Sequence, residues 1–200
     1  VAYAGICGSD LHIYKKGMFI QNIPETMGHE FSGTVIKTGS KVHSLQAGDR
    51  VTANPMVTCG NCIACRTERR GSCETLGFIG EVRPGCFAEY IALPQEDVIK
   101  APPDIDLKKL ALAEPLAVAL NICRQAKPAP TDKVLIVGPG PIGLLTALVL
   151  KNVCGLENPT ILGRSPARLS IAKALGMKTT TQLGDDSYCD LIIEAAGNET

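Results

Sequence analysis

A glycine turn in the second half of the chain restricts the fold more than any other feature. The apolar run at 133–137 leads into Gly138-Pro139-Gly140-Pro141-Ile142-Gly143, and an apolar helical pattern continues to Lys151. A strand, glycines at this spacing and a helix together are typical of a dinucleotide site. The first glycine permits a tight turn, the second lets the backbone approach a pyrophosphate, and the third lets helix and strand pack closely. The helix N-terminus then faces the phosphates.

Strands and helices continue to alternate after this turn. We expect strands at 159–162 and 190–194, and between them a helix at 166–175 that Gly176 ends. Continuous apolar strands that alternate with helices predict a parallel, doubly wound α/β sheet.

The end of the second strand bears on the choice of cofactor. An acid about 20 residues past the glycines would hold the ribose 2′-hydroxyl of NAD, but Gly163-Arg164-Ser165 stands there. No carboxylate would repel a 2′-phosphate and Arg164 can pair with one, so we expect NADP to be favoured over NAD. The alternative is a solvated surface arginine with weak selectivity. The residues expected to bind the cofactor are Gly138, Gly140, Pro141, Ile142, Gly143, Gly163, Arg164 and Arg168.

The first hundred residues favour short strands. The runs at 30–36, 48–53 and 87–93 carry β-branched or aromatic residues and are bounded by Gly, Asp or Pro. Such strands, separated by turns, suggest a barrel or sandwich. Helical patterns follow at 107–113 and at 116–125, where Pro115 would occupy the first helical position. With a linker at 127–130, we expect one domain at 1–128 and a second at 129–200.

Four of the nine cysteines lie close together between 59 and 73, as Cys59-x-x-Cys62-x-x-Cys65-x7-Cys73. Four thiolates at this spacing can close a tetrahedral zinc site with no open position, which is the structural kind. The alternatives are disulfides or free thiols. This motif alone also allows a non-catalytic zinc-binding or nucleic-acid-binding module.

A second set of possible metal ligands is dispersed along the chain. It comprises Cys7, the pair His29-Glu30, and Glu114. A catalytic zinc needs three protein ligands and one open position, which Cys, His and Glu can supply. Spacing alone leaves open whether these segments converge, since Cys7 could be a small buried residue and His29 an ordinary turn histidine.

The charge balance bears on possible partners. Lys plus Arg equals Asp plus Glu, at 20 each, so no net positive charge favours nucleic acid or an anionic membrane. The longest apolar runs, such as 142–150, are shorter than the roughly 20 residues that cross a bilayer. A cysteine cluster suggests metal in a reducing compartment, and we expect a cytoplasmic protein.

Several motifs follow one another along the chain: Cys7-Gly8-Ser9-Asp10-x-His12, Gly28-His29-Glu30, Gly48-Asp49-Arg50-Val51, the four cysteines, Phe87-Ala88-Glu89-Tyr90, Glu114-Pro115-Leu116 and the glycine turn. In this order they resemble the zinc-dependent medium-chain alcohol/polyol dehydrogenases. Within that family, Glu114 stands where the vertebrate alcohol dehydrogenases have Cys, and the resemblance therefore points to the sorbitol, butanediol and sugar-alcohol branches.

The resemblance implies a GroES-like β-barrel catalytic domain without its N-terminal strands and a Rossmann domain incomplete at its C-terminus, with the active site between them. The chain would then be the central part of a longer enzyme. Two zincs are implied, one structural at the four cysteines and one catalytic. Cys7 and His29 would ligate the catalytic zinc, with Glu30 or Glu114 binding directly or through a water.

The resemblance also implies a reaction, in which a hydride passes between NAD(P) and a secondary alcohol of a polyol, vicinal diol or sugar alcohol. Ser9 would be the proton-relay hydroxyl and His12 the outer imidazole of the relay. A threonine-type or simple alcohol dehydrogenase is the alternative within the family. The expected partners are a small-molecule alcohol and further copies of the chain, in a dimer or tetramer.

Four other cysteines receive no role in this scheme. Cys86 replaces a glycine that is usual in the family, and we expect a packing variant near the four-cysteine motif. Cys123, Cys154 and Cys189 are expected to be ordinary buried thiols.

Overall fold

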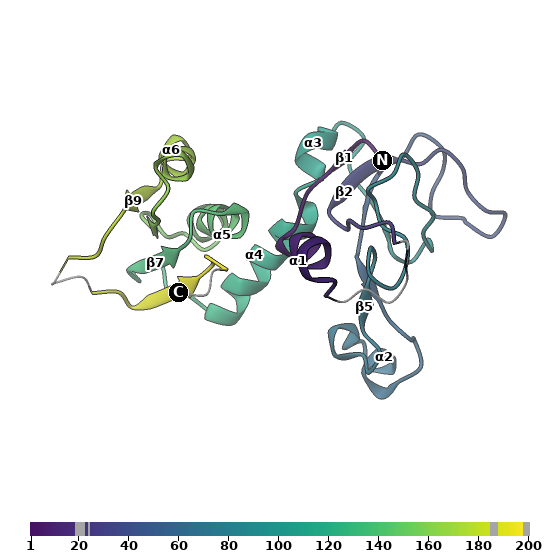
Figure 1. The fold of residues 1–200 in the computed structure, drawn as a ribbon, viewed down its shortest axis with the longest axis horizontal. Helices are drawn as coiled ribbons and strands as arrows, with labels where there is room; N and C mark the ends of the chain where they lie inside the picture. Colours follow the sequence, from purple (N-terminus) through teal and green to yellow (C-terminus); the bar gives the residue numbers. More distant parts are fainter. Residues whose placement is uncertain (19–22, 24, 185–187, 198–200) are drawn as a thin grey trace. The chain divides into compact units, whose positions relative to one another are not determined.

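The computed structural model describes residues 1–18, 23, 25–184 and 188–197 (Figure 1). It contains two compact units, Val1–Glu114 and Pro115–Thr200. The division falls near the start of α4 (Ala113–Ala126), earlier than the expected boundary at 128. The reason is packing, since Ala119 and Cys123 of this helix are buried in the same core as the strands of the second unit.

The first unit is built on a four-stranded antiparallel sheet in the order β1-β2-β3-β6. These strands are β1 (Tyr3–Ala4), β2 (Phe31–Thr34), β3 (Arg50–Ala53) and β6 (Val98–Lys100). Their buried core contains Phe31, Ala53, Ile79 and Cys86. The expected β-rich half is therefore present, with strands shorter than the sequence patterns suggested.

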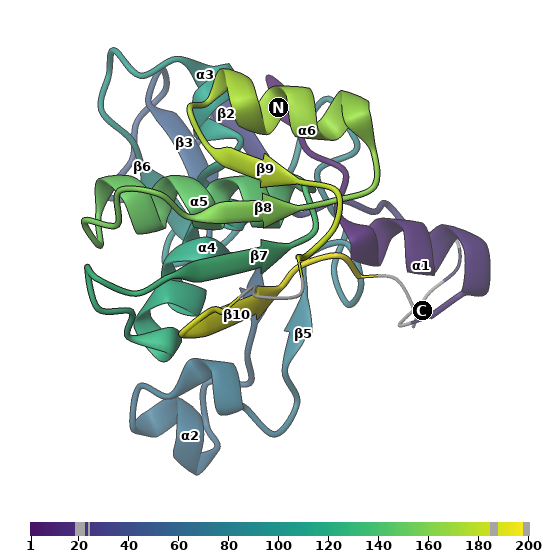
Figure 2. The ribbon, with the colours of Figure 1, turned by 90° about the vertical axis from the view of Figure 1, so that its left-hand side faces the viewer.

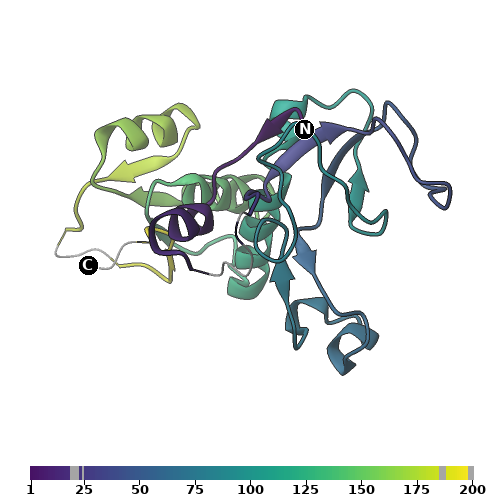
Figure 3. The same cartoon turned by 45° about the vertical axis from the view of Figure 1, so that its right-hand side comes forward.

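A small lobe projects from this unit on a two-stranded ribbon (Figure 3). The ribbon pairs β4 (Met56–Val57) with β5 (Gly77–Phe78). Between them lie the short helix α2 (Ile63–Arg66) and the 3₁₀ turn η1 (Arg70–Ser72). The lobe thus carries all four cysteines of the 59–73 motif.

The helix α1 (Gly8–Lys16) was not predicted from the sequence. The Asp10 carboxylate accepts a hydrogen bond from the Cys7 backbone N–H at 2.8 Å, which caps the helix start. Gly17, in the left-handed conformation with φ 63°, ends it. The motif from Cys7 to His12 therefore lies at the beginning of a helix.

Two of the expected elements differ from the structure near residue 110. The helix expected at 107–113 is only α3 (Leu107–Leu110), because the chain turns at 111–112 before α4 begins. Since α4 starts at Ala113, Pro115 is its third residue and not its first. A proline is tolerated there because the first four N–H groups of a helix have no partner within it.

The strand expected at 87–93 is absent, although the structure describes all of these residues. Phe87 N donates to Met27 O at 2.9 Å, whereas Glu89 O accepts from the amino group of Val1 at 2.8 Å. These bonds go to different parts of the chain, so the segment lacks the repeated ladder that makes a strand.

The second unit has a parallel four-stranded sheet in the order β10-β7-β8-β9 (Figure 2). Its strands are β7 (Val134–Val137), β8 (Thr160–Leu162), β9 (Lys178–Thr180) and β10 (Leu191–Glu194), and its further helices are α5 (Pro141–Asn152) and α6 (Pro166–Ala174). The prediction of a parallel α/β sheet is confirmed. β9 was not predicted, because Lys178-Thr179-Thr180 is short and polar. Among the described residues, no helix is long and apolar enough to span a membrane.

Candidate active site and metal centres

The pairing of β1 with β2 brings the segment that carries Cys7 next to the segment that carries His29. Tyr3 pairs with Ser32 and Ala4 with Phe31, and Gly5 N donates to Glu30 O at 2.8 Å. The same antiparallel register therefore continues one residue beyond the strands. A Cβ atom on Gly5 would overlap Oε2 of Glu30, so glycine at this position leaves room for the carboxylate.

Cys7, His29 and Glu30 form one compact group. Each offers one ligand atom, and the three atoms lie within 4.8 Å of one another. Thiolate, imidazole and carboxylate are all zinc ligands, and three of them leave a fourth position open, as in catalytic sites. Glu114 is not in this group, but it lies close enough for its charge to raise the pKa of His29. The structure thus brings the dispersed residues of the sequence together.

The protonation of this group suits a cation. Burial acts to lower the pKa of His29, but the hydrogen bond to Cys7 and the negative charges nearby outweigh it and raise that pKa to about 9. The hydrogen bond from His29 lowers the pKa of Cys7. The pair therefore favours a thiolate beside an imidazolium, whose proton a metal ion would displace. Burial raises the pKa of Glu30 and of Glu114.

The start of α1 supplies three more polar side chains. The Ser9 hydroxyl hydrogen-bonds the Cys7 sulfur, and His12 lies one turn further along α1, exposed. Asp10 is only 2% exposed, and within the described residues its Oδ1 has no hydrogen-bond partner. Asp10 received no role from the sequence, although its position three residues after Cys7 is a signal for a capping box.

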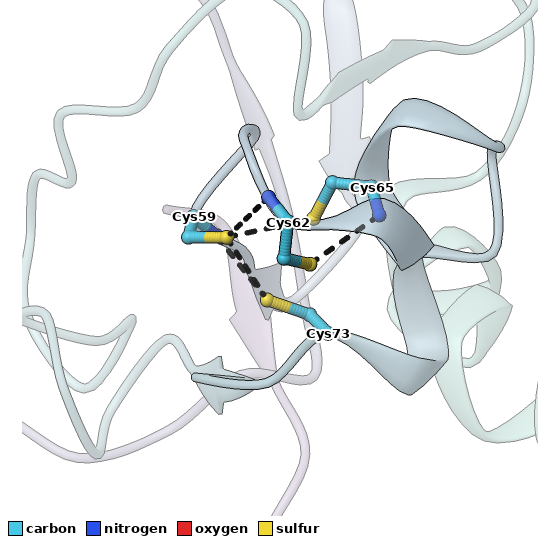
Figure 4. A group of neighbouring side chains, drawn as sticks. All are labelled: Cys59, Cys62, Cys65 and Cys73. Carbon is cyan, nitrogen blue, oxygen red and sulfur yellow. Dashed lines mark hydrogen bonds between the residues drawn. The ribbon is translucent and has the colours of Figure 1, made fainter.

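The four cysteines of the lobe also converge (Figure 4), with ligand atoms within 4.8 Å of one another. The sulfur of Cys59 lies 3.6 Å from that of Cys73 and 3.9 Å from that of Cys65. Zn–S bonds of about 2.3 Å in a tetrahedron require sulfurs about 3.8 Å apart, whereas a disulfide requires about 2.05 Å. The spacing fits a tetrahedral metal ion, and all four cysteines are free of disulfides.

Backbone N–H groups also point at the sulfurs of the lobe. Cys62 N donates to the Cys59 sulfur at 3.3 Å, and Cys59 N donates to the Cys73 sulfur at 3.4 Å. The latter bond is the main reason that the pKa of Cys73 falls to about 6. Such bonds stabilise thiolates, the form in which cysteine binds metal.

An ion pair attaches the lobe to the sheet of the first unit. Arg70 contacts the buried carboxylate of Asp97 at 3.2 Å and the hydroxyl of Thr58 at 3.3 Å. The backbone N–H of Asp97 donates to Pro94 O in the loop before β6, and the backbone carbonyl of Asp97 accepts from Asn54 N. The lobe is therefore held by more than its two short strands.

In the second unit, the glycine turn has the geometry of a phosphate site. Gly138 has φ 112°, and a Cβ on Gly143 would overlap the Gly138 carbonyl, so both positions require glycine. Gly140 is the N-cap of α5, with Pro141 at the first turn and no side-chain cap. The N–H groups at the helix start are thus open to an anion.

Arg164 lies at the same edge of the sheet as this turn. Val137 pairs with Leu162 in the parallel register, and Gly138 N donates to Leu162 O at 2.9 Å. A Cβ on Gly163 would lie 2.5 Å from Cγ of Pro139, so the two loops touch. Arg164 and, one turn along α6, Arg168 are exposed. Both arginines are therefore free to meet a ligand.

Of the remaining cysteines, Cys86 lies beside the three-residue group, with its sulfur 3.8 Å from Glu30 O. Burial raises the pKa of Cys86 to about 12. Cys123 is buried as expected, whereas Cys154 and Cys189 are only half-buried.

Comparison with known proteins shows which proteins this chain is related to. The model of the alcohol dehydrogenase GroES-like domain matches residues 1–103. A probable D-xylulose reductase A of Aspergillus clavatus is 42% identical over 177 residues, which are 86% of this chain and 49% of that protein. An L-threonine 3-dehydrogenase of Legionella pneumophila (strain Corby) is 35% identical over 192 residues, 94% of this chain and 56% of that protein.

The fold of this chain is also similar to that of a solved dehydrogenase structure. The 2R,3R-butanediol dehydrogenase of Bacillus subtilis superposes with a TM-score of 0.85 at 34% identity, covering 97% of this chain and 61% of that one. The chain spans about half the length of the curated relatives that it matches. The chain belongs to the zinc-dependent medium-chain alcohol/polyol dehydrogenase family.

Proposed function

We propose that the intact protein transfers a hydride between NAD(P) and a secondary alcohol of a polyol, vicinal diol or sugar alcohol. The observation that carries this proposal is that one ligand atom each of Cys7, His29 and Glu30 lies within 4.8 Å of the others, because a zinc ion with three protein ligands keeps a fourth position for a substrate. The names of the relatives, a xylulose reductase and a butanediol dehydrogenase, support an alcohol as substrate. The nicotinamide cofactor, when bound, supplies the hydride acceptor.

Two zinc ions are part of this proposal. Cys7, His29 and Glu30 would hold the catalytic ion, with Glu114 as a nearby alternative carboxylate. Cys59, Cys62, Cys65 and Cys73 would hold the structural ion. When bound at the three-residue group, zinc would polarise the substrate oxygen as a Lewis acid.

The chain itself would carry the proton. The Ser9 hydroxyl is hydrogen-bonded to the Cys7 sulfur, so it lies beside the position that the alcohol would take. A hydroxyl there can accept the proton of the alcohol while it donates its own proton to the next group. The exposed imidazole of His12 can deliver a proton to water. Ser9 and His12 therefore serve as the two ends of a relay.

The second unit would bind the dinucleotide. The open N–H groups at the start of α5 would bind the pyrophosphate, with Gly138, Gly140 and Gly143 shaping the turn. Arg164 and Arg168 would meet the 2′-phosphate, which makes NADP the favoured cofactor. We place the protein in the cytoplasm as a homo-oligomer that needs neither nucleic acid nor membrane.

A substrate panel on the intact protein tests the activity. The panel contains sorbitol, xylitol, 2,3-butanediol and threonine, each with NADP and with NAD. We expect oxidation of at least one polyol or diol with a kcat/KM well above that for threonine. Preferred oxidation of threonine would favour the threonine-type reading, and no oxidation of any alcohol would contradict the proposal.

A further inference from the structure

Glu81 is an acidic side chain that the sequence motifs left without a role. It stands on the tight turn after β5, in which Glu81 N and Val82 N both donate to Phe78 O at 3.1 Å. Its side chain is half-buried. Among the residues that the structure describes, its carboxylate forms no hydrogen bond and no ion pair, so it stabilises nothing visible in the fold.

The turn is held against the residue that precedes His29. Gly80 has φ 86°, and a Cβ on it would lie 2.7 Å from Gly28 N. A Cβ on Gly85 would overlap Gly28 O, and Cys86 N donates to the same carbonyl at 2.9 Å. These close backbone contacts fix the turn, and with it Glu81, next to the three-residue group.

Glu81 lies within the electrostatic field of that group. Burial raises the pKa of Glu81, the positive charge of His29 lowers it, and the negative charge of Asp10 raises it further. Asp10 is 2% exposed and has an unpartnered oxygen, and Glu114 acts on His29 from another element. Three carboxylates in addition to Glu30 therefore interact with His29 by charge.

In their ionised form, these carboxylates would give a loaded site a net negative charge. The two charges of a divalent ion would be balanced by the thiolate of Cys7 and the carboxylate of Glu30. The charges of Asp10, Glu81 and Glu114 then remain. A substrate with a phosphate or carboxylate would be repelled, whereas hydroxyl or ammonium groups would find acceptors.

We infer that Glu81 determines substrate class by charge, so that the protein selects uncharged or ammonium-bearing alcohols over phosphorylated or carboxylated ones. This inference rests on the proposed function. Glu81 is the residue to test, because it has no part in holding the fold or the metal, whereas Asp10 caps α1.

Turnover of a matched pair of substrates tests the inference on the intact, zinc-loaded protein. We expect kcat/KM to be higher for sorbitol than for sorbitol 6-phosphate. We expect Glu81→Gln to lower the ratio of these two kcat/KM values about fivefold and to leave the zinc content unchanged. The control is Glu96→Gln, an exposed glutamate beside the four-cysteine lobe, which should leave the ratio unchanged. A wild type that prefers the phosphate ester, or a ratio that Glu81→Gln changes less than twofold, overturns the inference.

A binding measurement separates this inference from the proposed function. In the cobalt-substituted intact protein, acetate and the neutral ligand imidazole are titrated against the visible spectrum. We expect Glu81→Gln to tighten acetate about fivefold and to leave imidazole unchanged. Equal acetate affinities in wild type and variant overturn the role of Glu81. A shift in acetate affinity without turnover of any alcohol supports that role and contradicts only the proposed reaction.

Discussion

At the scale of single residues, the side chains around Cys7 divide into those that would bind metal and those that would move a proton. Ser9 belongs to the second kind, because its hydroxyl contacts the Cys7 sulfur without being part of the three-residue group. We predict that Ser9→Ala lowers kcat by about 10²-fold or more while the zinc content stays the same. Steady-state kinetics and metal analysis check this, with Ser170→Ala, an exposed serine of α6, as the control. An unaltered kcat would remove Ser9 from the relay.

Arg164 is the residue that would choose between the two nicotinamide cofactors. It is exposed at the sheet edge that also carries the glycine turn. We predict that Arg164→Ala lowers kcat/KM for NADP by about tenfold or more and changes that for NAD by less than threefold, because a charge-assisted bond to the 2′-phosphate is lost. Arg124→Ala, on the exposed side of α4, is the matched control. A wild type that prefers NADH by tenfold would contradict the assignment.

The pKa of His29 predicts how metal binding depends on pH. Without metal, His29 has a pKa of about 9, so a proton must leave it when a metal binds at neutral pH. The apparent zinc affinity of this site should therefore rise about tenfold per pH unit between about 6.5 and 9 and level off above that. Competition with a chelator at several pH values measures it. An affinity that does not change over this range would show that His29 is not a ligand.

At the scale of elements, the contact between β7 and α5 depends on Gly143. A methyl group at this position would overlap the Gly138 carbonyl. We predict that Gly143→Ala lowers the free energy of unfolding by about 1–3 kcal/mol and weakens cofactor binding. Thermal unfolding and cofactor titration check this. Gly39→Ala, where a Cβ would meet no atom within 4 Å, should change neither quantity, and an unchanged cofactor affinity in Gly143→Ala would contradict the phosphate site.

The elements that the sequence predicted well are those whose signal is local. The glycine turn with its strand and helix, and α6 with Gly176 two residues past its end, follow from apolar periodicity and turn residues. The helix α1 was missed because only nine residues form it and few of them are apolar. The segment 87–93 was wrongly expected to be a strand because alternation does not reveal whether a pairing partner exists.

At the scale of the whole molecule, the nature of both units could be predicted, but spacing alone could not show that the candidate metal ligands converge, and only the resemblance to the dehydrogenase family implied it. Cys7 and His29 meet because β1 and β2 pair in one register, and a shift of that register by one residue would move Cys7 away. Residue types show which atoms can bind zinc, whereas tertiary pairing decides which of them meet. For the same reason the sequence could not choose between Glu30 and Glu114, and only the former stands in the compact group.

The position of Glu81 is a second feature of this kind. Nothing in its local sequence connects it with His29, and its position near that residue arises from backbone packing of Gly80 and Gly85 against Gly28. Side chains that set substrate preference on short turns are therefore found from the structure more readily than from motifs.

We propose that the chain holds two metal ions of different kinds, one at Cys7, His29 and Glu30 and one at the four cysteines of the lobe, which are the two groups of possible ligands that the described residues form. Zinc content per chain of the intact protein, measured for the wild type and for Cys7→Ser, tests it most directly. We expect two zinc ions in the wild type and one in Cys7→Ser, with loss of alcohol oxidation and retention of the fold. A single zinc ion in both proteins would contradict it and would favour a non-catalytic zinc-binding module.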